Sequence, residues 1–389
     1  MKKRISILLC TVILVSLCSC KQQEESKATQ APAQEDFLVA ATLDPKSSDV
    51  LAPDGNEIFS FQFQDIEILI PEYPEAAQAI EDNLNAGIQS TRDAAQSLSS
   101  WAQEEYAHSA ANDWTAYYSR ILYCPERMDR KVFSVSGTVD DFAGGAHSNV
   151  TAISATYDTA TGAALSLEDV LLSEASLSDL QALTLDALEQ RSETLELVDY
   201  EAAVASRFDL TDPASANWYF SYDGLVFYFS PYEIAAYGEG TIEAELSYEN
   251  LSGILKEDYF PVKLSDLSNH SINAAKTDEI RMADFDTTFD VTVDEGGEEV
   301  AVFTHTTLAQ VTLTTGYWNY FDDQYYTDQV LFAANRMTPQ DLLKIQTYVP
   351  DTLPNLRLVF RMNATEQESV YISQSGKDGS ILLLDEDDV

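Results

Sequence analysis

Apolar and polar residues follow two different periods along the chain, and these periods predict where helices and strands lie. Residues 58–70 alternate like a β-strand, and Pro71 and Pro74 end the pattern. After Pro74 the apolar residues return at helical spacing and predict a long amphipathic helix through Ile80, Leu84, Ile88, Ala95, Leu98 and Ala102. A second helical pattern follows at Leu177, Leu180, Leu183, Ala187 and Leu188.

Shorter alternating segments predict an antiparallel sheet beside these helices. They cover residues 133–139, 153–157 and 242–248. Residues 218–222 and 225–229 flank Asp223 and Gly224, a dipeptide typical of a hairpin turn. Two long helices against an antiparallel sheet predict an α+β module, which we place at residues 56–267.

The last part of the chain, residues 278–389, alternates mostly with the period of strands. Turn sequences at residues 294–297 (DEGG) and 375–379 (SGKDG) separate its apolar segments. We therefore expect a small C-terminal all-β domain of the sandwich type.

Residues 317–326, YWNYFDDQYY, hold six aromatic side chains in ten positions. Flat aromatic rings stack on sugars or anchor a partner protein, which makes Trp318 and Tyr320 candidate binding residues. Aromatic residues also pack well within sheets, so a place in the core is the alternative interpretation.

The N-terminal segment differs in composition from the rest of the chain. Lys2, Lys3 and Arg4 precede an apolar run of about 13 residues, the length of a signal-peptide core and too short for a membrane span. The run ends at residues 17–20, LCSC, which resemble the lipobox of bacterial lipoproteins. This resemblance implies a signal peptide at residues 1–19 and a lipid on Cys20.

An ordinary secretory signal with a chance cysteine is the alternative interpretation of this segment. Residues 20–55 contain few large apolar side chains and predict a flexible tether from the lipid. We therefore expect an extracytoplasmic protein that is anchored to the bacterial membrane through its N-terminal lipid.

Charge is the most unusual bulk property of the chain. The sequence has 22 basic and 65 acidic side chains, a net charge of −43. Once Lys2, Lys3 and Arg4 leave with the signal peptide, 19 basic side chains remain and the net charge is −46. Such a surface repels nucleic acid and anionic lipid headgroups, which argues against both as partners. The charge either provides solubility alone or attracts a basic partner.

Histidine and cysteine are too few and too scattered to predict a metal site. The four histidines do not pair at the spacing of metal ligands, and Cys124 is the one cysteine left after the signal peptide and Cys20. We therefore expect no metal and no cofactor. Cys124 is typical of a small buried residue, with a nucleophile as the alternative.

Several motifs follow one another in a fixed order in the middle of the chain. They are GGAHSN (144–149), YDTATG (157–162), LSLEDVL (165–171), SPYEIAAYGEG (230–240) and ELSYENL (245–251). This order resembles an extracytoplasmic bacterial module shared by RsiV-like anti-sigma factors, which sense lysozyme, and by the N-terminal region of PdaC-type peptidoglycan deacetylases. The resemblance covers residues 56–267 and implies a binding or sensing module of the cell envelope.

The chain departs from both kinds of protein in this family. Only residues 1–4 precede the apolar run, which leaves no cytoplasmic segment of the kind that an anti-sigma factor needs. The unpaired histidines do not match the metal-binding domain of a deacetylase. We therefore expect a binding lipoprotein that is not an enzyme, with a basic protein such as a lysozyme or a peptidoglycan component as partner. An unrecognised cell-wall hydrolase or deacetylase is the alternative function.

The motif residues have a structural and a functional interpretation. Those that we expect to shape the backbone are Gly144, Gly145, Asn149, Tyr157, Asp158, Gly162, Pro231 and Gly240. His147 either fixes the glycine bend by side-chain hydrogen bonds, together with Asn149, or contacts a ligand. Tyr232 and Tyr237 suit either a binding rim or a core, and Glu233 is the sharper candidate for contact with a basic partner.

Overall fold

The computed structural model describes residues 37–109, 113–208, 217–262, 264, 270–319, 324–350, 354–363 and 366–386. Its main feature is a ten-stranded sheet in the order β17-β16-β15-β12-β13-β1-β2-β3-β4-β5. In chain order these strands are β1 (Ala40–Leu51), β2 (Glu57–Leu69), β3 (Tyr117–Met128), β4 (Val132–Phe142), β5 (Asn149–Asp158), β12 (Leu308–Asn319), β13 (Gln324–Met337), β15 (Leu356–Arg361), β16 (Gln367–Gln374) and β17 (Ile381–Leu384). The β2–β3 pair is parallel, and the other described pairs of this sheet are antiparallel.

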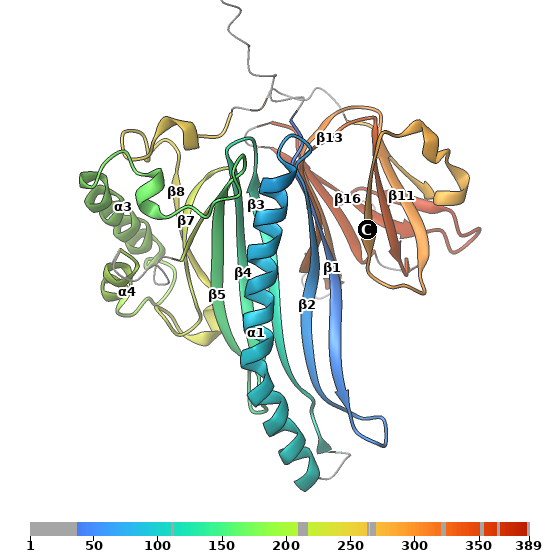
Figure 1. Cartoon of the computed structure of the whole chain (residues 1–389), viewed down its shortest axis with the longest axis horizontal. Helices are drawn as coiled ribbons and strands as arrows, with labels where there is room; N and C mark the ends of the chain where they lie inside the picture. The colour runs from blue at the N-terminus through green and yellow to red at the C-terminus, as the bar shows by residue number, and fades with distance from the viewer. Residues whose placement is uncertain are drawn as a thin grey trace, which may run out of the picture.

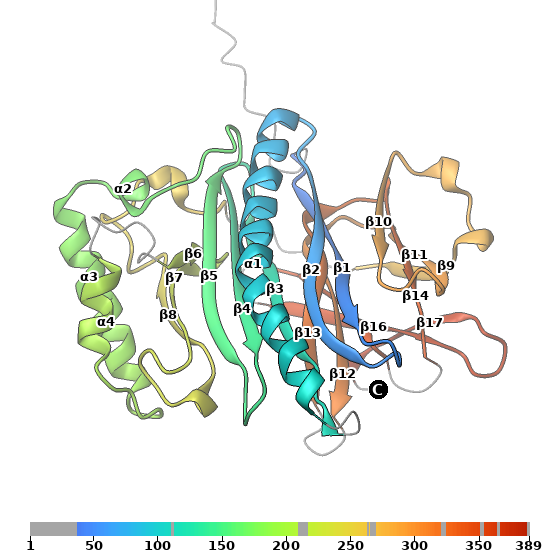
Figure 2. The ribbon, with the colours of Figure 1, turned by 60° about the horizontal axis from the view of Figure 1, so that its bottom comes forward.

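Two smaller sheets flank the large one. The first has the order β10-β14-β11-β9 and consists of β9 (Ile272–Lys276), β10 (Thr287–Thr292), β11 (Glu298–Thr304) and β14 (Asp341–Thr347). The second has the order β6-β7-β8 and consists of β6 (Trp218–Phe220), β7 (Gly224–Phe229) and β8 (Ile242–Ser247). Figures 1 and 2 show these two sheets at opposite ends of the molecule, with the first five strands of the chain between them.

Four α-helices accompany the sheets in the described residues: α1 (Pro74–His108), α2 (Leu167–Val170), α3 (Ala175–Arg191) and α4 (Tyr200–Arg207). Helix α1 runs along β2 and β3 (Figure 1), and the positions that carried the helical pattern, except for the partly buried Leu98, are buried against the sheet. Pro74 suits the start of α1 because a first-turn residue needs no backbone donor. None of the described helices is long and apolar enough to span a membrane.

Three hydrophobic cores hold these elements together. The first packs α1 against β1 to β5, and the second lies between the C-terminal half of the large sheet and the β9–β11–β14–β10 sheet. The third packs α2, α3 and α4 against β6, β7 and β8. The α+β fold class and the strand-rich, sandwich-like C-terminal region that the sequence predicts are therefore confirmed.

The predicted tether at residues 20–55 is wrong for its second half. Residues 40–51 form β1, a central strand that pairs with β2 along its whole length and with β13 through Ala40, Ala41 and Thr42. Phe37, the first of the described residues, is fully buried. The polar sequence of β1 misled the prediction because the outer part of this strand is exposed and carries Ser47, Ser48 and Asp49. Residues 20–36 lie outside the described part of the chain.

The predicted separation between the module and a C-terminal domain is wrong because β1 pairs with strands of both regions. Strand β1 joins the two regions into one sheet, and Leu38 and Ala40 lie in the core of the C-terminal region. In the other direction, Val330 and Ala333 of β13 lie in the core under α1. The two regions therefore share a sheet and exchange core residues, and a cut near residue 267 would remove a neighbour of β1.

A buried arginine joins the large sheet to the third core. Arg127, at the end of β3, is the largest side chain that is fully buried among the described residues. Its guanidinium donates to Asp129 Oδ2 at 2.7 Å, to the Tyr248 hydroxyl at 2.6 Å and to the Tyr259 carbonyl at 2.6 Å. Burial alone would lower the pKa of Arg127, but the carboxylate of Asp129 and the hydroxyl of Tyr248 raise it above its ordinary value. This arginine therefore stays charged within the fold.

Candidate functional site

The two most specific motifs of the sequence, GGAHSN and SPYEIAAYGEG, meet in space. The first forms the connection between β4 and β5, and the second forms the connection between β7 and β8. Strand β5 is an edge strand, and its Ala152 amide donates to Ser230 Oγ at 2.9 Å, at the start of the second motif. The two loops therefore lie side by side although about 85 residues separate them in sequence.

Three aromatic side chains from these loops form a compact group, which we call the His147 cluster: His147, Tyr232 and Tyr237. The rings of His147 and Tyr237 stack with centroids 3.9 Å apart and an interplanar angle of 22°. Tyr232 lies beside both, with its ring centroid 5.8 Å from His147 and 5.4 Å from Tyr237. His147 is exposed, and the Tyr232 side chain is 61% exposed, so the cluster faces solvent.

Hydrogen bonds assign the protons of this cluster. His147 Nδ1 lies 2.7 Å from the carbonyl oxygen of Ser148, which only accepts, so Nδ1 carries a proton. In the neutral imidazole, Nε2 is then an acceptor, and it receives the hydroxyl of Tyr232 at 3.1 Å. The hydroxyls of Ser148 and Tyr237 are 3.2 Å apart and add a further bond between the loops. These contacts fix the imidazole orientation but leave its outer face open.

The backbone under the cluster has unusual conformations. Gly144 and Gly145 have φ angles of +80° and +103°, and a side chain on Gly144 would come within 3.1 Å of the Tyr117 ring. Tyr232 itself has a φ of +68°, a left-handed conformation that costs a residue with a Cβ about 1 kcal/mol. Strain of this kind is found at positions where the side chain is needed in one place, and here it holds the Tyr232 ring outward.

Glu233 does not reach solvent as a free carboxylate. Arg207 Nη2, at the end of α4, donates to both of its oxygens at 2.6 and 2.7 Å, and the backbone amide of Ser230 donates to it at 2.9 Å. Burial lowers the pKa of Arg207, while the paired carboxylate works against that change. The charge of Glu233 closes the turn that presents Tyr232, and contact of Glu233 with a basic partner stays a prediction.

The aromatic segment 317–326 splits between core and surface. Trp318 is only 9% exposed and contacts the edge of Tyr371, so its proposed role as a binding residue is wrong. Tyr320 lies outside the described residues. The strand alternation places the neighbouring Tyr317 on the other face, 60% exposed and stacked on Tyr326 at 5.6 Å, a surface pair that the sequence did not single out.

The remaining motif residues shape the scaffold. Tyr157 is buried in the core under α1, and Gly162 has a φ of +71° where a Cβ would come within 2.7 Å of the Ala76 carbonyl. Burial alone would raise the pKa of Asp158, but hydrogen bonds from Lys131 and Thr161 lower it. The Lys131 contact fastens the turn after β5 to the turn between β3 and β4, and Gly162 lets the same turn lie close to the start of α1.

Three further motif residues lie in or next to the two loops. Pro231 and Gly240 bound the loop that carries the tyrosines, and Gly240 has a φ of +70°. Asn149 begins β5 opposite Asp141, with an exposed side chain that makes none of the hydrogen bonds described for this part of the chain. The expected contribution of Asn149 to the bend is therefore absent, and His147 fixes it without help from Asn149.

The chemistry around His147 consists of hydroxyl groups and backbone. In the described part of the chain, no group of three or more histidine, cysteine, aspartate or glutamate side chains is placed to hold a metal ion. Cys124 is partly buried on β3, and burial raises the pKa of its thiol well above the ordinary value. A protonated thiol is a weak nucleophile. The arrangement at the two loops is suited to contact with another molecule through ring faces, hydroxyls and one imidazole.

One segment of the chain is similar to a known domain family. Residues 169–249 match the family model described as a protein of unknown function, DUF3298, and this segment contains the second motif. A solved DUF3298 family structure from Bacteroides fragilis is 18% identical with a TM-score of 0.39, covering 56% of this chain and 94% of its own. Another from Pseudomonas aeruginosa PAO1 is 15% identical with a TM-score of 0.37, covering 57% and 96%. No curated protein matches the chain.

Proposed function

We propose that the protein is a lipid-anchored binding protein of the bacterial cell envelope, without catalytic activity of its own. The His147 cluster is the centre of the binding surface, and the partner is a basic protein such as a lysozyme or, failing that, a peptidoglycan component. The observation that carries this proposal is the meeting of the two family-like motifs in one exposed aromatic group.

The geometry of the cluster supports binding over a structural role. Tyrosine supplies a large contact area at a low entropic cost, which is why it is enriched where proteins bind one another. A ring that served only the fold would be buried, whereas the Tyr232 ring is exposed, on a backbone that is strained to present it. The loops are held by Arg207–Glu233 and by Ala152–Ser230, so the surface is formed before any partner arrives.

The charge of the chain supports a basic partner. The net charge of −46 expected after processing attracts cationic proteins over long distances and repels anionic ones. Near the cluster, Glu239 is exposed on the loop that carries Tyr237, and Asp141 lies at the start of the other loop. The proposal fails if the purified chain degrades or deacetylates peptidoglycan, with or without added metal.

A strongly basic lysozyme should bind the chain from Lys21 onward, with electrostatic steering of the encounter. We expect the association rate to fall by about tenfold or more between about 0.05 M and 0.5 M salt, while the dissociation rate changes less. Surface plasmon resonance at several salt concentrations measures both rates. The control is a basic protein of similar size and unrelated shape, and equally weak binding of both would leave the acidity as a source of solubility only.

Tyr232→Ala should weaken the binding of lysozyme by about tenfold or more, since a central exposed tyrosine of an interface is worth about 2 kcal/mol. Tyr317→Ala is the matched control because Tyr317 has the same exposure, 60% against 61%, but lies on β12 away from the cluster. Calorimetric titration of both variants checks the prediction. Equal affinities in the two variants would place the interface elsewhere on the chain.

A further inference from the structure

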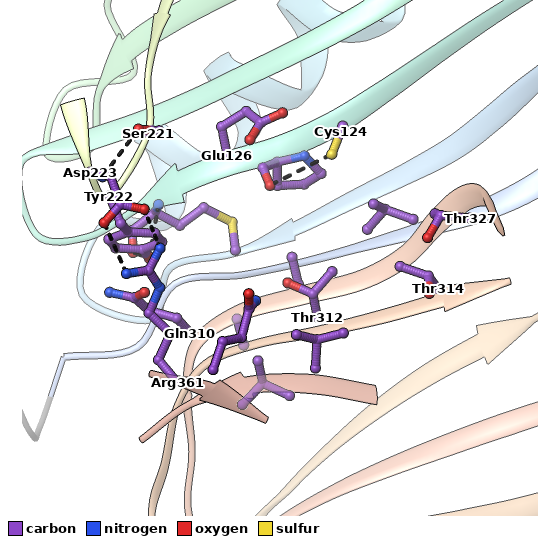
Figure 3. Close-up of a pocket in the computed structure, with 18 residues that line it drawn as sticks. Cys124, Glu126, Ser221, Tyr222, Asp223, Gln310, Thr312, Thr314, Thr327 and Arg361 are labelled. Carbon is purple, nitrogen blue, oxygen red and sulfur yellow. Dashed lines mark hydrogen bonds and ion pairs between the residues drawn. The ribbon is translucent and has the colours of Figure 1, made fainter. Parts of the chain in front are cut away.

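A second concave site lies where three parts of the fold meet. Its cavity has a volume of about 350 Å³ and is enclosed by β3, by the turn between β6 and β7, and by β12, β13 and β15 (Figure 3). This volume is within the range of small-molecule sites, about 300–1,000 Å³, which often form between structural units. None of the three residues of the His147 cluster lines this cavity.

The walls of the cavity combine apolar and polar side chains, and the charged residues among them carry a formal net charge of −1. The apolar side chains are Met128, Val311, Val330, Ala333, Ala334 and Val359. Three charged residues also line it: Glu126, Asp223 and Arg361. The guanidinium of Arg361 donates to both carboxylate oxygens of Asp223, with 2.9 Å between Nη1 and Oδ1. Since this pair neutralises the one cation of the wall, Glu126 leaves the lining with one negative charge. An anionic ligand would find no free cation in this lining.

Gln310 places an unpaired hydrogen-bond acceptor in the cavity. Its φ is +50°, and it lies in a bulge where the pairing of β12 with β15 shifts between Ala309 and Thr312. Its Oε1 is buried and has no hydrogen-bond partner among the described residues. Figure 3 shows the Gln310 side chain extending from β12 toward the interior of the cavity. A strained residue that holds an unpaired acceptor inside a cavity is placed to accept a hydrogen bond from a ligand.

Glu126 adds a negative potential on the opposite side. Its Oε1 accepts a hydrogen bond from Ser136 Oγ at 2.6 Å. Burial raises the pKa of the Glu126 carboxyl, and the nearby carboxylate of Glu243 raises it further. A bound cation would stabilise the ionised carboxylate against both effects.

We propose that this cavity binds a small organic cation, with its ammonium group at Gln310 Oε1, its apolar body against Val311, Val330 and Val359, and its charge balanced by Glu126. The ammonium group supplies the donor that Gln310 lacks and the positive charge that the lining lacks. The apolar walls select a ligand with a hydrocarbon part rather than a bare metal ion. This site is independent of the binding surface at the His147 cluster.

Three probes with the same hydrocarbon body and different head groups test the proposal: hexylammonium, 1-hexanol and hexanoate. The chain from Lys21 onward is used, because the contacts described here lie within residues 37–386. By calorimetric titration, hexylammonium should bind saturably and at least about tenfold more tightly than hexanol, and hexanoate should bind most weakly, as expected when a hydrogen bond to a charged group is gained. Equal binding of hexanol and hexylammonium would overturn the proposal.

Methionine methyl signals locate the bound probe. Met128 lines the cavity, whereas Met282, Met337 and Met362 do not. In a sample labelled with ¹³C-methyl methionine, hexylammonium should shift the Met128 signal with the same saturation curve and leave the other three in place. Saturable binding without a shift of Met128 would place the ligand elsewhere and overturn the proposal.

Gln310→Met and Glu126→Gln should each lower the affinity for hexylammonium by about tenfold or more. Glu126→Gln should leave the affinity for hexanol unchanged, whereas Gln310→Met should also weaken hexanol, because its hydroxyl can donate to Gln310 Oε1. Asp328→Asn is the matched control, because it removes one carboxylate from β13 outside the cavity. Circular dichroism checks that each variant folds, and Glu126→Gln decides the question if Gln310→Met does not. A loss of the same size in Asp328→Asn would reduce the effect to general charge and contradict the proposal.

Discussion

Arg127→Ala is expected to lower the free energy of unfolding by about 3–5 kcal/mol, the size found when one partner of a buried ion pair is removed. The side chain is fully buried and ion-paired with Asp129, and it bridges β3 to Tyr248 and Tyr259 of the third core. Its loss leaves the Asp129 carboxylate with the backbone amides of Lys131 and Val132 but without a countercharge.

Chemical denaturation followed by far-UV circular dichroism measures this effect. Arg281→Ala is the matched control, because the Arg281 side chain is 80% exposed and pairs with Asp284 on the surface. Such a pair contributes about 0–1 kcal/mol. If Arg127→Ala does not fold, Arg127→Lys is measured in its place. Lysine keeps the positive charge but lacks the planar guanidinium that reaches several acceptors, so this variant should be destabilised less than Arg127→Ala. If the free energy of unfolding of Arg127→Ala changed by less than about 1 kcal/mol, the prediction would be contradicted, and water would have replaced Arg127 as the partner of Asp129 and Tyr248.

The local elements of this fold follow from the sequence, because each depends on neighbours a few positions away. The period of Ile80, Leu84 and Ile88 was enough to predict α1, and Asp223-Gly224 marked the β6–β7 hairpin. The pairing of β1 with β13 could not be predicted, since Ala40 and Ala334 are almost 300 positions apart and hydrophobic alternation does not name a partner strand. This pairing accounts for the error in the predicted domain boundary, whereas the polar sequence of β1 accounts for the error in the predicted tether.

In the candidate site too, the sequence identified individual residues but not the contacts between residues that are far apart in the chain. The motifs marked His147, Tyr232 and Tyr237, but their stacking depends on β5 lying beside the loop before β8. The ion pair of Glu233 with Arg207 could not be predicted, because Arg207 lies on another element and the sequence offers no sign of that contact. The alternation of side chains along a strand places Tyr317 and Trp318 on opposite faces. Because both residues are aromatic, this alternation does not show which of the two is buried.

The cavity is formed by residues from three separate parts of the chain. Gln310, Glu126 and Asp223 come from β12, β3 and the β6–β7 turn, which belong to three different parts of the chain. A change in how these parts sit against one another would alter the cavity, so ligand binding there and the packing of the three cores are linked. No motif could have revealed this site, because each of its residues is ordinary in its own strand.

Cys20→Ala is expected to abolish lipidation and release the protein from the membrane fraction. In the lipoproteins that residues 17–20 resemble, the thiol at this position carries a diacylglyceryl group, and two acyl chains anchor a protein stably where one gives only marginal binding. The described part of the chain begins at the buried Phe37, and a segment as long as residues 21–36 can span at most about 50–60 Å from the anchor. Membrane fractionation and labelling with a radioactive fatty acid measure both effects.

Cys18→Ala is the matched control for this prediction, since it removes a thiol two positions earlier and leaves the acceptor in place. The control should keep the label and remain in the membrane fraction, whereas Cys20→Ala should lose the label and appear in the soluble envelope fraction or the medium. The folded part contains Cys124, but its thiol is partly buried with a pKa raised by burial, so it is a poor substitute acceptor. Fatty-acid labelling that persists in Cys20→Ala would therefore assign the anchor to another residue and contradict the lipoprotein interpretation.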